Sequence, residues 1–177
     1  MNLPNKITLF RVIMIPIFLV VYLIQDIPYG NYIAGAIFVI AAFSDFLDGY
    51  IARKNNLVTN FGKFMDPLAD KLLVSGALIC FVEYSLVPAW IVFVIIAREF
   101  IISGFRLIAS DNGIVIAASW WGKIKTNVQM IMSVLLIINL DHPVINLLEQ
   151  ISIYLALILT VISLVDYMVK NRNVLHE

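Results

Sequence analysis

The sequence predicts an all-α integral membrane protein with six transmembrane helices, and three observations lead to this fold class. Hydrophobic residues make up 62% of the chain and charged residues only 14%, far from the averages of soluble proteins. The apolar residues form six long stretches, and short connections rich in Pro, Gly, Asn and Asp separate them. The length of 177 residues suits one membrane domain covering residues 1–177. The zero net charge gives no support to nucleic-acid binding.

Six segments are expected to cross the lipid bilayer. In chain order they are residues 7–25, 31–53, 63–85, 88–110, 120–140 and 144–169. The polar residues 2–6 are expected to lie at the interface, and no structure is predicted for residues 110–119.

The first four segments are too short if only their uncharged parts are counted. A span needs about 20 residues, and their uncharged runs are residues 12–24, 32–43, 72–82 and 89–97. The charged ends must therefore belong to the spans, so that several helices carry ionisable groups to a similar depth. This predicts a polar cavity that is walled by helices and open to one side of the membrane.

The distribution of basic residues predicts which side that is. In a six-span topology, all twelve Lys and Arg residues fall at or near the side that holds both termini. The three loops on the opposite side, around residues 26–31, 83–88 and 141–143, contain no Lys or Arg. By the positive-inside rule, both termini and the cavity are expected on the cytoplasmic side of the cell membrane.

Two pairs of aspartates lie where the second segment ends and the third begins. Asp45 and Asp48 are three residues apart, and Asp66 and Asp70 are four apart. Residues at these spacings share one face of a helix. A short, Asn-rich connection lets the two helices run antiparallel, which would bring the four carboxylates together.

Three interpretations of this cluster are open from the residues alone. The acids could form ordinary ion pairs with nearby basic residues, namely Arg53, Lys54, Lys63 and Lys71. They could be protonated groups of a cation or proton carrier, although the nearly uncharged outer half and the absence of an evident internal repeat disfavour this. They could hold two divalent cations, Mg²⁺ or Mn²⁺, which suit phosphoryl transfer. The shared helical faces favour the metal interpretation, because ion pairing does not require them.

The acids and the small residues between them form one pattern of fixed spacing. It reads Asp45-x2-Asp48-Gly49-x2-Ala52-Arg53-x8-Gly62-x3-Asp66-x3-Asp70. This pattern resembles the signature of the CDP-alcohol phosphotransferase family, whose members transfer a phosphatidyl or similar group from a CDP-linked lipid to an alcohol and release CMP. The resemblance implies six membrane helices, two divalent cations and a homodimer in the lipid bilayer.

The resemblance also implies roles for individual residues. The metal ligands would be Asp45, Asp48, Asp66 and Asp70, and Asp70 would also be the catalytic base. The CDP-lipid would contact Gly49, Ala52, Arg53 and Gly62. Asn5 and Thr8 would either support the nucleotide site or form an interfacial turn.

Further motifs resemble the bacterial phosphatidylglycerophosphate synthases within this family. They are Pro4-Asn5-x2-Thr8-x2-Arg11, the run REFIISGFR at residues 98–106, and WGKIKT at residues 121–126 with Gln129. The implied substrates are CDP-diacylglycerol and sn-glycerol 3-phosphate, and the alternative acceptors are serine, inositol phosphate and phosphatidylglycerol.

A phosphorylated acceptor needs basic donors at its site. Arg98, Arg106 and Lys123 are expected to bind the acceptor phosphate, with Glu99 either orienting or neutralising Arg98. Lys125 is assigned instead to the charge that sets the membrane topology.

Overall fold

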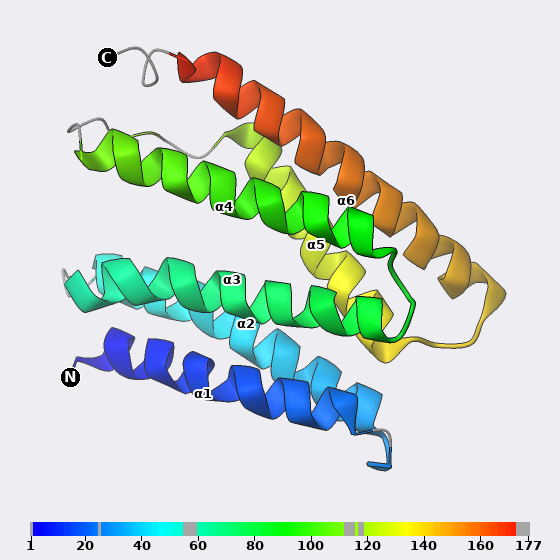
Figure 1. Cartoon of the computed structure of the whole chain (residues 1–177). Helices are drawn as coiled ribbons and strands as arrows, with labels where there is room; N and C mark the ends of the chain where they lie inside the picture. The colour runs from blue at the N-terminus through cyan, green and yellow to red at the C-terminus, as the bar shows by residue number, and fades with distance from the viewer. Residues whose placement is uncertain (1, 25, 55–59, 112–115, 117–118, 173–177) are drawn as a thin grey trace. The chain divides into compact units, whose positions relative to one another are not determined.

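The chain folds into α-helices, as a computed structural model of the whole sequence shows (Figure 1). The structure describes residues 2–24, 26–54, 60–111, 116 and 119–172. These residues form six helices: α1 (Leu3–Leu23), α2 (Gly30–Lys54), α3 (Asn60–Glu83), α4 (Ala89–Asp111), α5 (Trp120–Ile138) and α6 (Pro143–Lys170). The all-α prediction is confirmed, and most bounds lie within a few residues of those expected. The Asn-rich connection and most of residues 110–119 lie outside the described residues.

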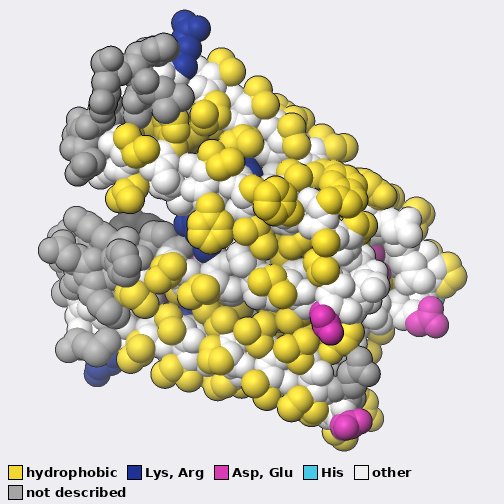
Figure 2. Space-filling model, viewed as in Figure 1, with side chains coloured by type: hydrophobic (Ala, Val, Ile, Leu, Met, Phe, Trp, Pro, Cys, Tyr) yellow, Lys and Arg dark blue, Asp and Glu magenta, His cyan; other side chains and the backbone are white. Residues whose placement is uncertain are grey.

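The helix surfaces are those of a membrane-embedded protein. Within the described residues, α1, residues 30–49 of α2, and α6 are long and apolar enough to cross a membrane. Large apolar side chains on α4 and α6 are strongly exposed, for example Phe93 at 72% and Val169 at 64%, and Figure 2 shows apolar side chains covering much of one face. Soluble proteins rarely expose such extensive apolar surface. Crossing by all six helices and a cavity open to the cytoplasm stay predictions.

Helix α1 begins four residues earlier than the expected span. The Asn2 side chain accepts a hydrogen bond from the Asn5 backbone nitrogen at 3.2 Å, and Pro4 lies in the first turn. An Asn cap followed by an early proline is a favourable helix start. The capped extension makes residues 3–6 helical and continuous with Thr8 and Arg11.

The contacts divide the chain into two compact units. The first unit comprises residues 1–84 and 133–139, and the second comprises residues 85–132 and 140–177. In the first unit, α1 packs against α2 and α3. Phe18 of α1 lies 5.8 Å from Tyr22 and 5.6 Å from Phe38 of α2, measured between ring centroids. These aromatic contacts hold the α1 surface against α2.

The second unit is built on the packing of α4 against α6. Its buried core includes Ile102 and Phe105 of α4 and Tyr167 of α6. Phe105 and Tyr167 meet edge to face, with ring centroids 5.8 Å apart.

Candidate active site

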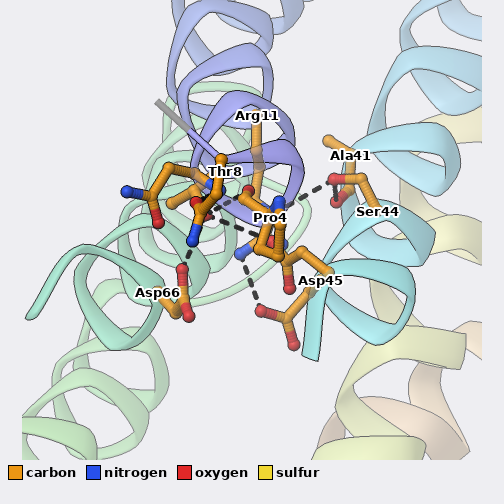
Figure 3. Close-up of polar contacts among 10 residues, drawn as sticks. Pro4, Thr8, Arg11, Ala41, Ser44, Asp45 and Asp66 are labelled. Atoms are coloured by element: carbon orange, nitrogen blue, oxygen red, sulfur yellow. Dashed lines mark hydrogen bonds and ion pairs between the residues drawn. The ribbon is translucent and has the colours of Figure 1, made fainter. Parts of the chain in front are cut away.

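The two aspartates near the end of α2 share a positive partner, Arg11 of α1 (Figure 3). The Arg11 Nη1 atom donates to Asp45 Oδ1 and the Nη2 atom to Asp48 Oδ2, each at 2.6 Å. The Nε atom donates to Ser44 Oγ at 3.2 Å. A single planar guanidinium can reach both carboxylates because they lie on one face of α2, as their spacing of three predicts.

Burial makes this arrangement energetically important. Arg11 is fully buried and Asp48 is 2% exposed, whereas the Asp45 side chain keeps 42% of its surface accessible. A buried charge without a partner is strongly unfavourable, so Arg11 and Asp48 stabilise each other inside the helix packing. The more accessible Asp45 gives the pair an edge that a ligand can approach.

The hydroxyl of Thr8 connects this pair to α3. Its Oγ1 atom lies 2.8 Å from Asp66 Oδ1, 3.3 Å from Asp48 Oδ2 and 3.1 Å from the Pro4 carbonyl oxygen. A hydroxyl has one hydrogen and can donate to only one of these acceptors at a time. Thr8 and Arg11 therefore gather three of the four expected metal ligands, from two helices, into one network, which we call the aspartate network (Asp45, Asp48, Asp66, Thr8 and Arg11).

The other residues of the signature lie on the same two helices. Asp70 is half-buried one turn after Asp66 on α3, and Gly62 is buried one turn before Asp66. Gly49 follows Asp48 on α2. Ala52 and Arg53 also belong to α2, but their side chains lie outside the described residues. Asn5 is buried in the first turns of α1.

The chemistry of the aspartate network fits a hard divalent cation. Among the described residues, no three Asp, Glu, His or Cys side chains converge closely enough to form a metal site. The network nevertheless offers carboxylate oxygens, the ligands that Mg²⁺ and Mn²⁺ prefer. The guanidinium of Arg11 places a positive charge between Asp45 and Asp48.

A second charged cluster lies in the second unit and has the opposite sign. Glu99 Oε1 accepts from Arg98 Nη1 at 2.9 Å and from Lys125 Nζ at 2.5 Å. The Nε atom of Arg98 donates to Ser163 Oγ of α6 at 3.1 Å. Arg98 is 7% exposed and Lys125 is 1% exposed. We call Arg98, Glu99, Lys125 and Ser163 the basic cluster, because two cations share one carboxylate.

The three residues expected to bind the acceptor phosphate have different surroundings. Arg98 is buried in the basic cluster, whereas Arg106 and Lys123 are exposed on α4 and α5. The guanidinium carbon of Arg106 lies 5.7 Å from the centre of the Tyr167 ring. This is a cation–π distance.

Lys125 and Arg11 lie in buried ion pairs that the sequence does not predict. Membrane topology, the role expected for Lys125, needs no particular geometry, yet Lys125 is buried in an ion pair with Glu99. One signal in the sequence is that Gln129 lies four residues after Lys125, so that two polar side chains share one face of α5. Arg11 was recognised within a motif but received no role.

Comparisons with known proteins agree with the signature. The family model for CDP-alcohol phosphatidyltransferase matches residues 1–162. The chain is 46% identical to the CDP-diacylglycerol–glycerol-3-phosphate 3-phosphatidyltransferase of Bacillus subtilis, over 98% of this chain and 97% of that protein. It is 40% identical to the enzyme of the same name from Haemophilus influenzae, over 94% of this chain and 91% of that protein. It is 37% identical to a probable phosphatidylglycerophosphate synthase of Mycobacterium tuberculosis, over 96% of this chain and 81% of that protein. The chain therefore belongs to the CDP-alcohol phosphatidyltransferase family.

Proposed function

We propose that the protein transfers the phosphatidyl group of CDP-diacylglycerol to sn-glycerol 3-phosphate, giving phosphatidylglycerol phosphate and CMP in phospholipid biosynthesis. The observation that carries this proposal is the near full-length similarity, at 46% identity, to a relative with that enzyme name. The aspartate network supports it, because clustered carboxylates beside a nucleotide-lipid signature suit metal-assisted phosphoryl transfer.

In this reaction the acceptor hydroxyl attacks the phosphorus that bears the diacylglycerol, and the diphosphate bond to CMP breaks. We assign Asp70 as the base that takes the hydroxyl proton, for which it must come within hydrogen-bond reach of the acceptor. Asp45, Asp48, Asp66 and Asp70 would hold two divalent cations, Mg²⁺ or Mn²⁺. Bound there, the cations would offset the negative charge on the diphosphate and on departing CMP.

The CDP-lipid and the acceptor need different surroundings. Gly49 and Gly62, with no side chain, would let the nucleotide part of the CDP-lipid approach the helix backbones closely, beside Asn5, Thr8, Ala52 and Arg53. For the acceptor phosphate we assign Arg98, with Arg106 and Lys123. The basic cluster supports this assignment, since two cationic side chains lie together beside one Glu99 oxygen and cationic groups form the strongest hydrogen bonds to phosphate.

The proposed setting is the cell membrane, with both termini and the active site facing the cytoplasm and the enzyme acting as a homodimer. The distribution of all Lys and Arg residues along the sequence supports this orientation. Glycerol 3-phosphate is water-soluble and would arrive from the cytoplasm, whereas the lipid tails of CDP-diacylglycerol would remain in the bilayer.

An acceptor panel tests the proposal. Purified protein in detergent would be supplied with CDP-diacylglycerol, Mg²⁺ or Mn²⁺, and one of glycerol 3-phosphate, serine, inositol phosphate or phosphatidylglycerol, with CMP release as the readout. We expect glycerol 3-phosphate to react fastest and EDTA to stop the reaction. Fast turnover with serine and none with glycerol 3-phosphate would overturn the acceptor but leave the family chemistry intact.

A further inference from the structure

Arg11 takes the place of a cation within the aspartate network. It donates to Asp45 and Asp48 through separate nitrogens, each at 2.6 Å, and it is fully buried. We propose that Arg11 is a built-in counter-ion of Asp45 and Asp48 that competes with a divalent cation for these two carboxylates. The inference rests on the metal site of the proposed function, and it adds a role for Arg11 that the signature does not contain.

The geometry brings guanidinium and metal into competition at these oxygens. A divalent cation bound by Asp45 Oδ1 and Asp48 Oδ2 would lie about 2.0–2.6 Å from each oxygen. The Nη atoms of Arg11 already lie 2.6 Å from the same two oxygens. Two positive charges this close, in surroundings of low dielectric constant, repel each other strongly. Each should therefore weaken the binding of the other.

The burial of Asp48 explains why the site needs a counter-ion. Its side chain is 2% exposed, and Asp66 approaches the same Thr8 hydroxyl. Without a cation, the acids would repel one another, and the buried Asp48 would lack solvent to screen its charge. Arg11 offsets part of this negative charge, and a divalent ion at the same carboxylates would offset more of it.

Ser44 provides a way to loosen Arg11 without altering a carboxylate. Its Oγ atom accepts from Arg11 Nε at 3.2 Å and donates to the Ala41 carbonyl oxygen at 2.7 Å. Removal of this hydroxyl takes away one of the three contacts that hold the guanidinium. If Arg11 competes with metal, the loss of Ser44 Oγ should favour metal binding.

A contrasting role for Arg11 predicts the opposite result. If Arg11 served to orient Asp45 and Asp48 for the metal, its removal would disorder the ligands and weaken binding. The sign of the change in metal affinity therefore separates a competitor from a support.

The experiment is an Mn²⁺ titration of the purified full-length protein in detergent, without substrates, with free Mn²⁺ measured by electron paramagnetic resonance. We expect Arg11→Gln to bind Mn²⁺ about tenfold more tightly than wild type, because close charge pairs couple strongly. Arg11→Lys should give a smaller increase, since an ammonium keeps the charge but lacks the fork that spans two carboxylates. Ser44→Ala should give the smallest increase.

Thermal unfolding supplies a second readout. In EDTA, Arg11→Gln should unfold at a lower temperature than wild type, and Mn²⁺ should raise its unfolding temperature by more than it raises that of wild type. Unchanged or weaker Mn²⁺ affinity in the Arg11 variants, with normal binding by wild type, would overturn the inference alone. If Arg11→Gln does not fold, the Mn²⁺ affinities of Arg11→Lys and Ser44→Ala decide instead. Tighter binding than wild type supports competition, and unchanged or weaker binding overturns it. Wild-type protein that binds no Mn²⁺ would instead overturn the metal site of the proposed function, and this inference with it.

Discussion

The aspartate network and the basic cluster solve the same problem with opposite charges. In the aspartate network, one buried guanidinium bridges two carboxylates of α2, and a third carboxylate lies nearby on α3. In the basic cluster, one carboxylate oxygen of Glu99 receives two cations, from α4 and α5. Each cluster thus has one central residue of the minority sign.

The difference in residual charge is informative about function. Partial neutralisation lets each cluster exist among apolar helices, where unpaired charges are expensive. Among the residues that define them, the aspartate network holds three acids and one base, and the basic cluster holds one acid and two bases. A majority of acids suits metal ions, and a majority of bases suits a phosphate.

The largest effect is expected from Asp70→Asn, which tests the assignment of Asp70, one of the signature aspartates, as the catalytic base. Loss of a general base lowers turnover by about 10²–10⁴-fold, because asparagine cannot accept the acceptor proton. CMP release would measure the rate, and the unfolding temperature would confirm that the variant folds. Activity within twofold of wild type would remove Asp70 from the catalytic role.

Arg98→Ala tests whether Arg98 of the basic cluster binds the acceptor phosphate. Loss of charge-assisted hydrogen bonds to a phosphate should raise the KM for glycerol 3-phosphate about 10–100-fold and leave the KM for CDP-diacylglycerol nearly unchanged. Arg172→Ala is the matched control, because Arg172 is an exposed arginine after the end of α6 and should change neither constant. An equal rise of both KM values in Arg98→Ala would indicate a structural role for Arg98.

Glu99→Gln tests whether Glu99 balances the charge of the basic cluster as Arg11 balances that of the aspartate network. The substitution leaves Arg98 and Lys125, both buried, without their shared carboxylate, so the unfolding temperature should fall by several degrees. If the cluster binds the acceptor phosphate, glycerol 3-phosphate should restore more of this loss than it adds to wild type, since its dianion replaces the missing charge. Equal stabilisation of variant and wild type would contradict that parallel.

Local spacing predicted those parts of the molecule that depend on residues close in sequence. The helix bounds and the shared face of Asp45 and Asp48 agree with the structure. Each follows from helical periodicity or from continuous apolar sequence, which act within a few turns.

The partners across helices could not be predicted in this way. The contacts of Arg11 with Asp45 and Asp48 span 34 and 37 residues of sequence, and the Lys125–Glu99 contact spans 26. Periodicity places a residue on a face of its own helix but does not tell which helix covers that face. The sequence suggests basic residues close to the aspartates as their partners, whereas a partner found among the described residues, Arg11, belongs to α1.

The smallest effect is expected from Lys170→Ala, which removes an ion pair that belongs to neither cluster. Lys170 Nζ lies 2.6 Å from Asp166 Oδ1 one turn earlier on α6, as their spacing predicts; the Lys170 side chain is 63% exposed and that of Asp166 is 16% exposed. Solvent screens the exposed ammonium of this pair, so its loss should cost about 0.5 kcal/mol of folding stability and leave CMP release unchanged. Unfolding temperatures of Lys170→Ala and Glu99→Gln, measured side by side, would compare an ion pair whose cation is exposed with one whose cations are buried. Equal losses in the two variants would mean that burial of the cations does not distinguish the basic cluster from the Lys170–Asp166 pair.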